Sequence, residues 1–276
     1  MEEKNIIKKE SPRGLFDSHA HYFDSRFEGQ AEELLPNEIF GGKVSGVVNV
    51  GTNPENALLC IEQAKKYAEM YAAVGIHPED CKALTGTVEE EVARIRALLD
   101  IPEKRRANKI VALGEIGLDY YWQPLEKELQ QAYFEAQLSL AAELNLPVII
   151  HDREAHGDCF ETVLRYPTVR GVFHSYSGSA EMARELTRRG WYISFSGVLT
   201  FKNARKVREV AATVPAELTL IETDAPYLAP EPFRGRLNHS GLMVYTAETL
   251  ADLIGKSPQE VADMTAANAR RLFEIE

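Results

Sequence analysis

Short apolar segments alternate with helical patterns along almost the whole chain. The apolar segments are continuous runs rather than strict alternations of apolar and polar residues. Continuous runs are typical of strands that are covered on both faces, as in parallel sheets. The sequence contains eight such candidate strands, at residues 14–21, 44–51, 70–77, 109–117, 146–152, 170–176, 191–197 and 217–224.

The segments between these strands have apolar residues at helical spacing. A helix is predicted from Pro54, a favourable first-turn residue, and another from Thr87, which forms a Thr-x-x-Glu capping box with Glu90. Residues 257–264 contain another capped start, SPQEVADM. The predicted helical segments are 54–70, 87–100, 125–145, 179–190, 202–213 and 244–275, with an extra helical turn expected within 24–43. A further helix is expected to start at His156.

Eight strands, each followed by a helix within about 250 residues, predict an α/β fold of the (β/α)8 TIM-barrel type. The alternative is an open doubly wound sheet, which usually has a glycine-rich turn after its first strand. Here the first strand ends in His19-Ala20-His21 instead. No linker rich in Pro, Gly or Ser divides the chain, so we expect one domain over residues 1–276.

The net charge of −11 excludes one class of function. Coating duplex DNA without regard to sequence requires a basic surface, so any nucleic-acid partner must be bound locally. The chain contains no apolar segment of the roughly 20 residues needed to span a membrane, and its polar start, MEEKNIIKKE, is not a signal peptide. Three scattered cysteines fit free thiols in a reducing compartment. We therefore expect a cytoplasmic protein, monomeric and without a membrane partner.

Metal-binding side chains occur at the predicted strand ends, where barrels of this type place their active sites. The first strand brings His19 and His21 to one face. The other candidates are Glu115, His151, His174 and Asp224, at the ends of strands four, five, six and eight. A lone histidine at such a position is more often structural than a ligand, and a lone aspartate often caps the next helix. The combined pattern is typical of a metal centre.

Four imidazoles and two carboxylates are too many for one tetrahedral ion. They suit two divalent ions, about 3.5–4 Å apart, that share a bridging carboxylate. Imidazole ligands favour Zn or Mn over Mg, which prefers oxygen. The sequence leaves the choice among Zn, Mn and Mg open.

Several motifs, taken in order, resemble the TatD family of metal-dependent hydrolases. They are FDSHAH, GIHP, LGEIGLDYYW, PVIIHDREA, VFHSYSGS, SFSGVLTFKNA and ETDAPYLAP followed by RGRLN, and they run from about residue 15 to residue 238. The resemblance implies a TIM barrel of the amidohydrolase-like group with a binuclear metal centre. It also implies phosphodiester hydrolysis, with 3′–5′ exonuclease activity on DNA or a short oligonucleotide as the usual assignment.

The resemblance also implies a role for each matched position. Asp224 would hold one metal together with His19 and His21, and would act as a proton acceptor. Glu115 would bridge to a second metal. That second metal would be held by His151 and His174. Substrate phosphates would meet His77, Arg153 and Lys202.

One loop and two single residues depart from the family pattern. The loop at 234–240 reads RGRLNHS and lacks one basic residue and one proline, Tyr176 replaces a common Phe, and Glu79 replaces a common His. None of these changes removes an expected ligand. They affect the expected substrate preference more than the chemistry.

Two other functions remain open. The same scaffold could hydrolyse an ester or amide, such as the ester of a D-aminoacyl-tRNA. Relatives with amide chemistry often have a lysine at the bridging position, so Glu115 favours the nuclease. A binding protein without activity would have lost a ligand, and no ligand is missing.

Overall fold

The computed structural model describes residues 11–276. The first ten residues, on which the expectation of no signal peptide depends, lie outside the described part.

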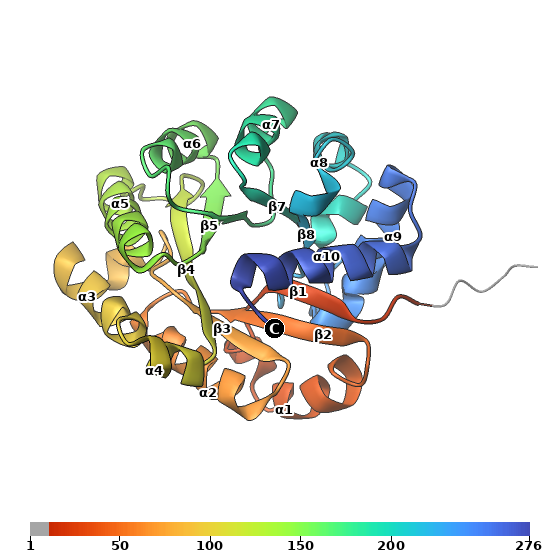
Figure 1. Ribbon diagram of the computed structural model, residues 1–276, viewed down its shortest axis with the longest axis horizontal. Helices are drawn as coiled ribbons and strands as arrows, with labels where there is room; N and C mark the ends of the chain where they lie inside the picture. Colours follow the sequence, from red (N-terminus) through yellow and green to blue (C-terminus); the bar gives the residue numbers. More distant parts are fainter. Residues whose placement is uncertain (1–10) are drawn as a thin grey trace, which may run out of the picture.

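Eight parallel strands form one sheet in the order β1 to β8, with the helices around it (Figure 1). Ala20 and Ala225 form a parallel bridge that joins the first strand to the segment after the last. The predicted TIM barrel is confirmed. The strands are β1 Leu15–Ala20, β2 Val44–Val50, β3 Met70–Val74, β4 Ile110–Asp119, β5 Val148–Arg153, β6 Gly171–Phe173, β7 Tyr192–Phe195 and β8 Thr219–Ile221.

The helices follow the predicted segments closely. The capping boxes at Thr87 and Ser257 are both formed. None of the helices in residues 11–276 combines the length and the apolar character that crossing a membrane requires. The helices are α1 Ala31–Leu34, α2 Pro54–Lys66, α3 Val88–Leu99, α4 Pro102–Ala107, α5 Lys127–Leu144, α6 His156–Leu164, α7 Ala180–Arg188, α8 Arg205–Ala211, α9 Met243–Ile254 and α10 Pro258–Phe273.

Three details differ from the sequence prediction. The last predicted helical segment is two helices, because Gly255 ends α9 in a left-handed conformation with φ of +69°. The short helix α4 was not predicted. Strands β6 and β8 have only three residues each, so His174 and Asp224 lie just beyond their strands. The expected helical structure between β1 and β2 is present as short turns around α1.

The two ends of the barrel differ. Its interior is filled by buried apolar side chains such as Phe16, Ile149 and Leu220. Leu272 and Phe273 of α10 belong to the same cluster, and Figure 1 shows α10 lying across the barrel. This helix packs on β1 and β8. The end from which the strands begin is thus covered, and the opposite end remains for function.

Candidate metal centre

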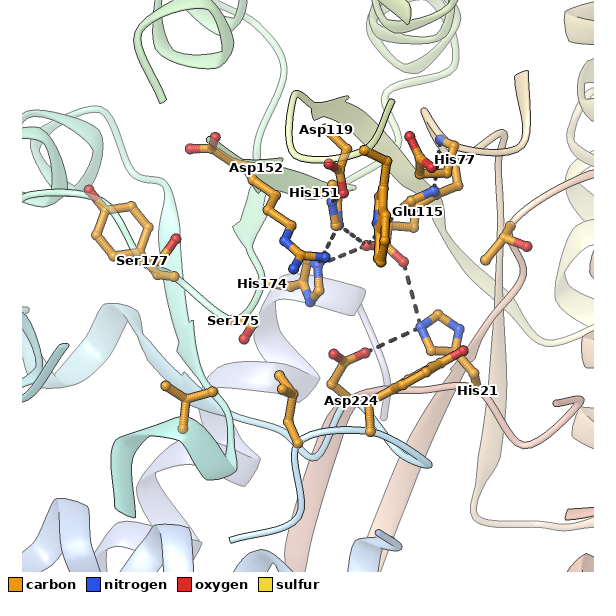
Figure 2. A pocket seen from close by; sticks show the side chains of 18 of the residues that line it. His21, His77, Glu115, Asp119, His151, Asp152, His174, Ser175, Ser177 and Asp224 are labelled. Carbon is orange, nitrogen blue, oxygen red and sulfur yellow. Dashed lines mark hydrogen bonds and ion pairs between the residues drawn. The ribbon is translucent and has the colours of Figure 1, made fainter. Parts of the chain in front are cut away.

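The six side chains expected as ligands converge at the carboxyl end of the barrel. Five of them line the floor of a cavity of about 630 Å³ (Figure 2), and the sixth, His19, lies against His21 of this floor. His19 is fully buried and Glu115 is 2% exposed. The structure therefore brings the following set together: His19, His21, Glu115, His151, His174 and Asp224.

Backbone hydrogen bonds across the closure of the barrel position the first group. The N–H of His21 donates to the carbonyl of Ala225 at 2.7 Å, and the N–H of Asp224 donates to the carbonyl of His19 at 2.9 Å. Asp224 adopts a left-handed conformation with φ of +58°, which aspartate tolerates better than most residues. These bonds hold Asp224 beside the two histidines of β1.

Close packing of two strands positions the second group. Gly117 of β4 has φ of +143°, and a Cβ at this position would lie 2.0 Å from the carbonyl oxygen of His151. Only glycine permits this approach. As a result, Glu115 on β4 and His151 on β5 lie within hydrogen-bonding distance, with 2.7 Å between Oε1 and Nδ1.

The carboxylate of Glu115 faces two groups of histidines, one with each oxygen (Figure 2). Its Oε2 lies 3.3 Å from Nε2 of His19 and 3.6 Å from Nε2 of His21. Its Oε1 lies 2.7 Å from Nδ1 of His151 and 2.8 Å from Nε2 of His174. A carboxylate that bridges two cations requires this division of its oxygens.

The outer ring nitrogens of three histidines donate hydrogen bonds to acceptors behind them. Because a neutral imidazole has one donor and one acceptor nitrogen, the inner nitrogens then present lone pairs to the centre. The three bonds are His21 Nδ1 to the Val50 carbonyl at 2.7 Å, His151 Nε2 to Asp119 Oδ2 at 3.0 Å, and His174 Nδ1 to Glu222 Oε1 at 3.2 Å.

The inner nitrogens approach one another closely. His19 Nε2 lies 3.0 Å from His21 Nε2, and His151 Nδ1 lies 3.2 Å from His174 Nε2. Facing lone pairs repel unless a proton or a cation lies between them. Within residues 11–276, His19 Nδ1 is also buried without a hydrogen-bond partner. This donor set fits divalent transition metals, with Glu115 shared between two ligand groups.

Protons occupy part of this space in the protein without metal. Burial alone would lower the pKa of His151, but hydrogen bonds with Asp119 and Glu115 raise it to about 9. Burial likewise opposes ionisation of Glu115, but the neighbouring histidines hold its pKa well below the usual value. Metal binding must displace these protons, so it is coupled to their release.

His77 differs from the other histidines of the cavity. Its Nδ1 accepts a hydrogen bond from the N–H of Glu79 at 3.0 Å, so the neutral ring has its proton on Nε2. Burial and the nearby His151 lower the pKa of His77 to about 3, which keeps the ring neutral. Its Nε2 lies 3.7 Å from Oε1 of Glu115. His77 therefore presents an N–H donor rather than a ligand lone pair.

The two cationic residues expected to meet substrate lie in different places. Arg153, at the end of β5, is exposed and lines the cavity. Lys202 is exposed but is not among the residues that line the cavity. The structure therefore does not bring Lys202 to the metal centre. A substrate contact of Lys202 stays a prediction.

The sequence analysis missed the acceptors behind the ligands. Asp119 is buried and holds the outer nitrogen of His151, and its carbonyl accepts from Gln130. Buried Glu222 does the same for His174. Strand parity contained the signal: Asp119 is four residues after Glu115, and Glu222 two residues before Asp224.

Comparison with known proteins agrees with this geometry. The family model described as TatD related DNase matches residues 16–274. The uncharacterized metal-dependent hydrolase YabD of Bacillus subtilis is 40% identical over 264 residues, which cover 95% of this chain and 99% of YabD. The uncharacterized metal-dependent hydrolase TatD of Mycobacterium tuberculosis is 34% identical and covers 95% of this chain and 98% of its own.

A solved structure gives the same result. The crystal structure of YjjV, a TatD homologue from Escherichia coli, superimposes with a TM-score of 0.86 at 30% identity and covers 95% of this chain and 98% of its own. The barrel and the converging ligand set define a metal-dependent hydrolase. Within that class, the chain belongs to the TatD-related DNase family.

Proposed function

We propose that this protein hydrolyses phosphodiester bonds in DNA, from the 3′ end of a strand, with two divalent cations at the centre described above. The main support is the arrangement of lone pairs. Three histidines are fixed so that their inner nitrogens face a shared carboxylate, Glu115, whose two oxygens serve different histidine groups. The match to a family of DNases supports the choice of substrate.

Two ligand groups would hold the cations. One comprises His19, His21 and Asp224, and the other comprises His151 and His174, with Glu115 between them. Bound divalent cations polarise phosphoryl oxygens and lower the pKa of a nearby water. Imidazole nitrogens favour Zn or Mn at this centre. Metal analysis of the purified protein tests that preference, and full activity in Mg alone with no bound transition metal would contradict it.

Three side chains of the cavity would act on the water or the phosphate directly. Burial opposes ionisation of Asp224, but its hydrogen bond with His21 and the nearby charges of His174 and His19 together lower its pKa, so Asp224 is ionised. Its carboxylate can therefore accept the proton of an attacking water. His77 Nε2–H can donate to a phosphoryl oxygen, where charge builds up during the reaction. The guanidinium of Arg153 can hold a second phosphate oxygen at the rim.

The deciding experiment compares three substrates with the metal-replete protein: a 5′-labelled single-stranded DNA, an RNA of the same sequence and a D-aminoacyl-tRNA. We expect the DNA to shorten one nucleotide at a time from its 3′ end. Cleavage of the aminoacyl ester with intact DNA would instead identify an ester hydrolase on the same scaffold. Glu115→Ala, assayed in parallel, excludes a contaminating nuclease.

A further inference from the structure

Large aromatic side chains are exposed at the mouth of the metal-site cavity. Tyr121 is 52% exposed, Trp122 is 49% exposed and Tyr227 is 46% exposed. Trp122 and Tyr227 line the same cavity as Glu115. Single exposed apolar residues are ordinary on a protein surface. Two exposed aromatic rings that line one cavity, with Tyr121 packed edge-on against Trp122, form a distinct feature of its rim.

The rings stand on opposite sides of the metal centre. Tyr121 and Trp122 lie in the segment after β4, whereas Tyr227 lies in the segment after β8. In a barrel with the strand order β1 to β8, β4 and β8 face each other across the opening. A ligand that lies over the metal centre therefore has an aromatic wall on either side.

Each wall includes an arginine. The guanidinium carbon of Arg153 lies 3.8 Å from the ring centre of Tyr121 and 5.4 Å from that of Trp122. The guanidinium carbon of Arg26 lies 3.9 Å from the ring centre of Tyr227. Within residues 11–276, Arg153 forms no ion pair with a carboxylate, so its charge is available to a phosphate. Planar arginines stacked on aromatic rings fit the alternation of bases and phosphates in nucleic acid.

The negative charge of the protein and of its cavity explains why base stacking would matter for substrate binding. The chain has a net charge of −11, and phosphate contacts alone would attract a nucleic acid poorly. Stacking of a base on an aromatic ring does not depend on net charge, and every base has a π face. The carboxylates that line the cavity are Asp24, Glu79, Asp80, Glu115, Asp119, Asp152 and Asp224.

We propose that the Trp122 wall and the Tyr227 wall are stacking platforms for nucleobases, one on each side of the phosphodiester that lies over the metal centre. The ligand is a single-stranded end with at least two bases, because a paired duplex offers no free base faces to both walls. This inference rests on the proposed phosphodiesterase function and adds how the substrate is recognised.

Intrinsic fluorescence can test the platform directly. The chain has two tryptophans, and Trp191 is only 3% exposed, so a ligand in the cavity can quench only Trp122. The probe is a tetrathymidylate with phosphorothioate linkages, which resist hydrolysis, titrated into the metal-replete full-length protein. Matched probes have a single abasic residue on one side or the other of the bound linkage, and a ribose probe of the same sequence distinguishes RNA from DNA.

We expect the intact probe to quench Trp122 and the matching abasic probe to bind about 5-fold to 150-fold more weakly, the range for one stacked base. Affinity measured by the polarisation of a dye on the probe should fall equally in Trp122→Ala. The two losses should not add, because both remove the same contact. Tyr227→Ala should behave likewise with the other abasic probe. The control Leu58→Ala, 53% exposed on α2 and outside the cavity, should bind as the parent does.

Fully additive losses, or equal binding of intact and abasic probes, would overturn the platforms. Hydrolysis of a base-free phosphodiester such as bis(p-nitrophenyl) phosphate is measured separately. If that hydrolysis occurs while the probes bind without regard to their bases, the platforms are refuted and the phosphodiesterase stands. If base-dependent quenching occurs but no phosphodiester is cleaved, the proposed function is refuted instead.

Discussion

The floor and the rim of the cavity are built in opposite ways. On the floor, His19 and Glu115 are 0% and 2% exposed, and three of the four ligand histidines are held from behind by a carboxylate or a strand carbonyl. On the rim, Trp122 and Tyr227 are about half exposed and lie on the segments that follow β4 and β8. The side chains of the floor are fixed by burial and hydrogen bonds, whereas residues of the rim can be substituted without disturbing the barrel.

This difference separates chemistry from recognition. A change on the floor should affect every substrate, because it alters the groups that act on the phosphodiester itself. A change on the rim should affect substrates according to what flanks that bond. The following predictions test this separation, beginning with the largest expected effect.

Glu115→Ala should have the largest effect, because it removes the carboxylate that faces both histidine groups. We expect kcat to fall by at least about 10²–10³-fold, the range for losing one preorganised electrostatic contact. The loss should be the same for DNA and for a base-free phosphodiester. Steady-state assays and metal analysis of the purified variant measure it.

The matched control is Glu62→Ala, an exposed glutamate on α2. Its stability should change by no more than about 0.5 kcal/mol. Thermal unfolding of both variants shows whether the barrel is intact. Activity that survives Glu115→Ala in a folded protein would refute the bridging role.

Asp119→Asn should weaken metal binding by about 10- to 100-fold, as is usual when the partner behind a ligating histidine is altered. The amide keeps the shape of the side chain but loses the charge that holds Nε2–H of His151 at 3.0 Å. Competition with a chromophoric chelator measures the affinity. An unchanged affinity would show that Asp119 does not position His151.

The ligands on the floor were largely predictable from the sequence, because the carboxyl ends of all strands in a parallel barrel lie at the same end of the barrel. The motif around His19 and His21 and the acids Glu115 and Asp224 were enough to predict a shared centre, and the structure brings these side chains together. The acceptors behind the ligands were not predicted. Strand parity places Asp119 on the same face as Glu115, but it does not show that Asp119 pairs with His151 on the neighbouring strand.

The rim was less predictable for a physical reason. Its side chains lie on irregular segments whose direction is set by turns rather than by strand parity. Arg153 and Lys202 have the same charge and both are exposed, but of the two only Arg153 lines the cavity. Likewise, Trp122 follows a strand end in the sequence, and nothing in its local pattern distinguishes a cavity wall from an exposed turn.

Arg153→Ala and Lys202→Ala should therefore differ. We expect Arg153→Ala to lower kcat/KM for single-stranded DNA by about tenfold, equivalent to one hydrogen bond to a charged group. Lys202→Ala, outside the cavity, should lower it less than about twofold, as exposed charges do. Both are measured under identical salt. A larger loss from Lys202→Ala would mean that the bound substrate extends beyond the cavity towards α8.

The smallest expected effect concerns the support of the Tyr227 wall and depends on pH. Asp24 receives hydrogen bonds from Arg26, which lower the pKa of its carboxyl from 3.8 to about 2. Because the folded-state pKa lies below the usual value, the ionised carboxylate stabilises the fold above about pH 4. This contribution is lost as the pH falls towards about 2. Asp24→Asn should therefore cost about 1 kcal/mol at pH 7, after allowance for solvent screening, and progressively less as the pH approaches 2. Urea unfolding of both proteins at pH 7, 4 and 2.5 measures the difference. A cost that stays constant across this range would mean that the amide disturbs packing, and that charge pairing does not hold Arg26 against Tyr227.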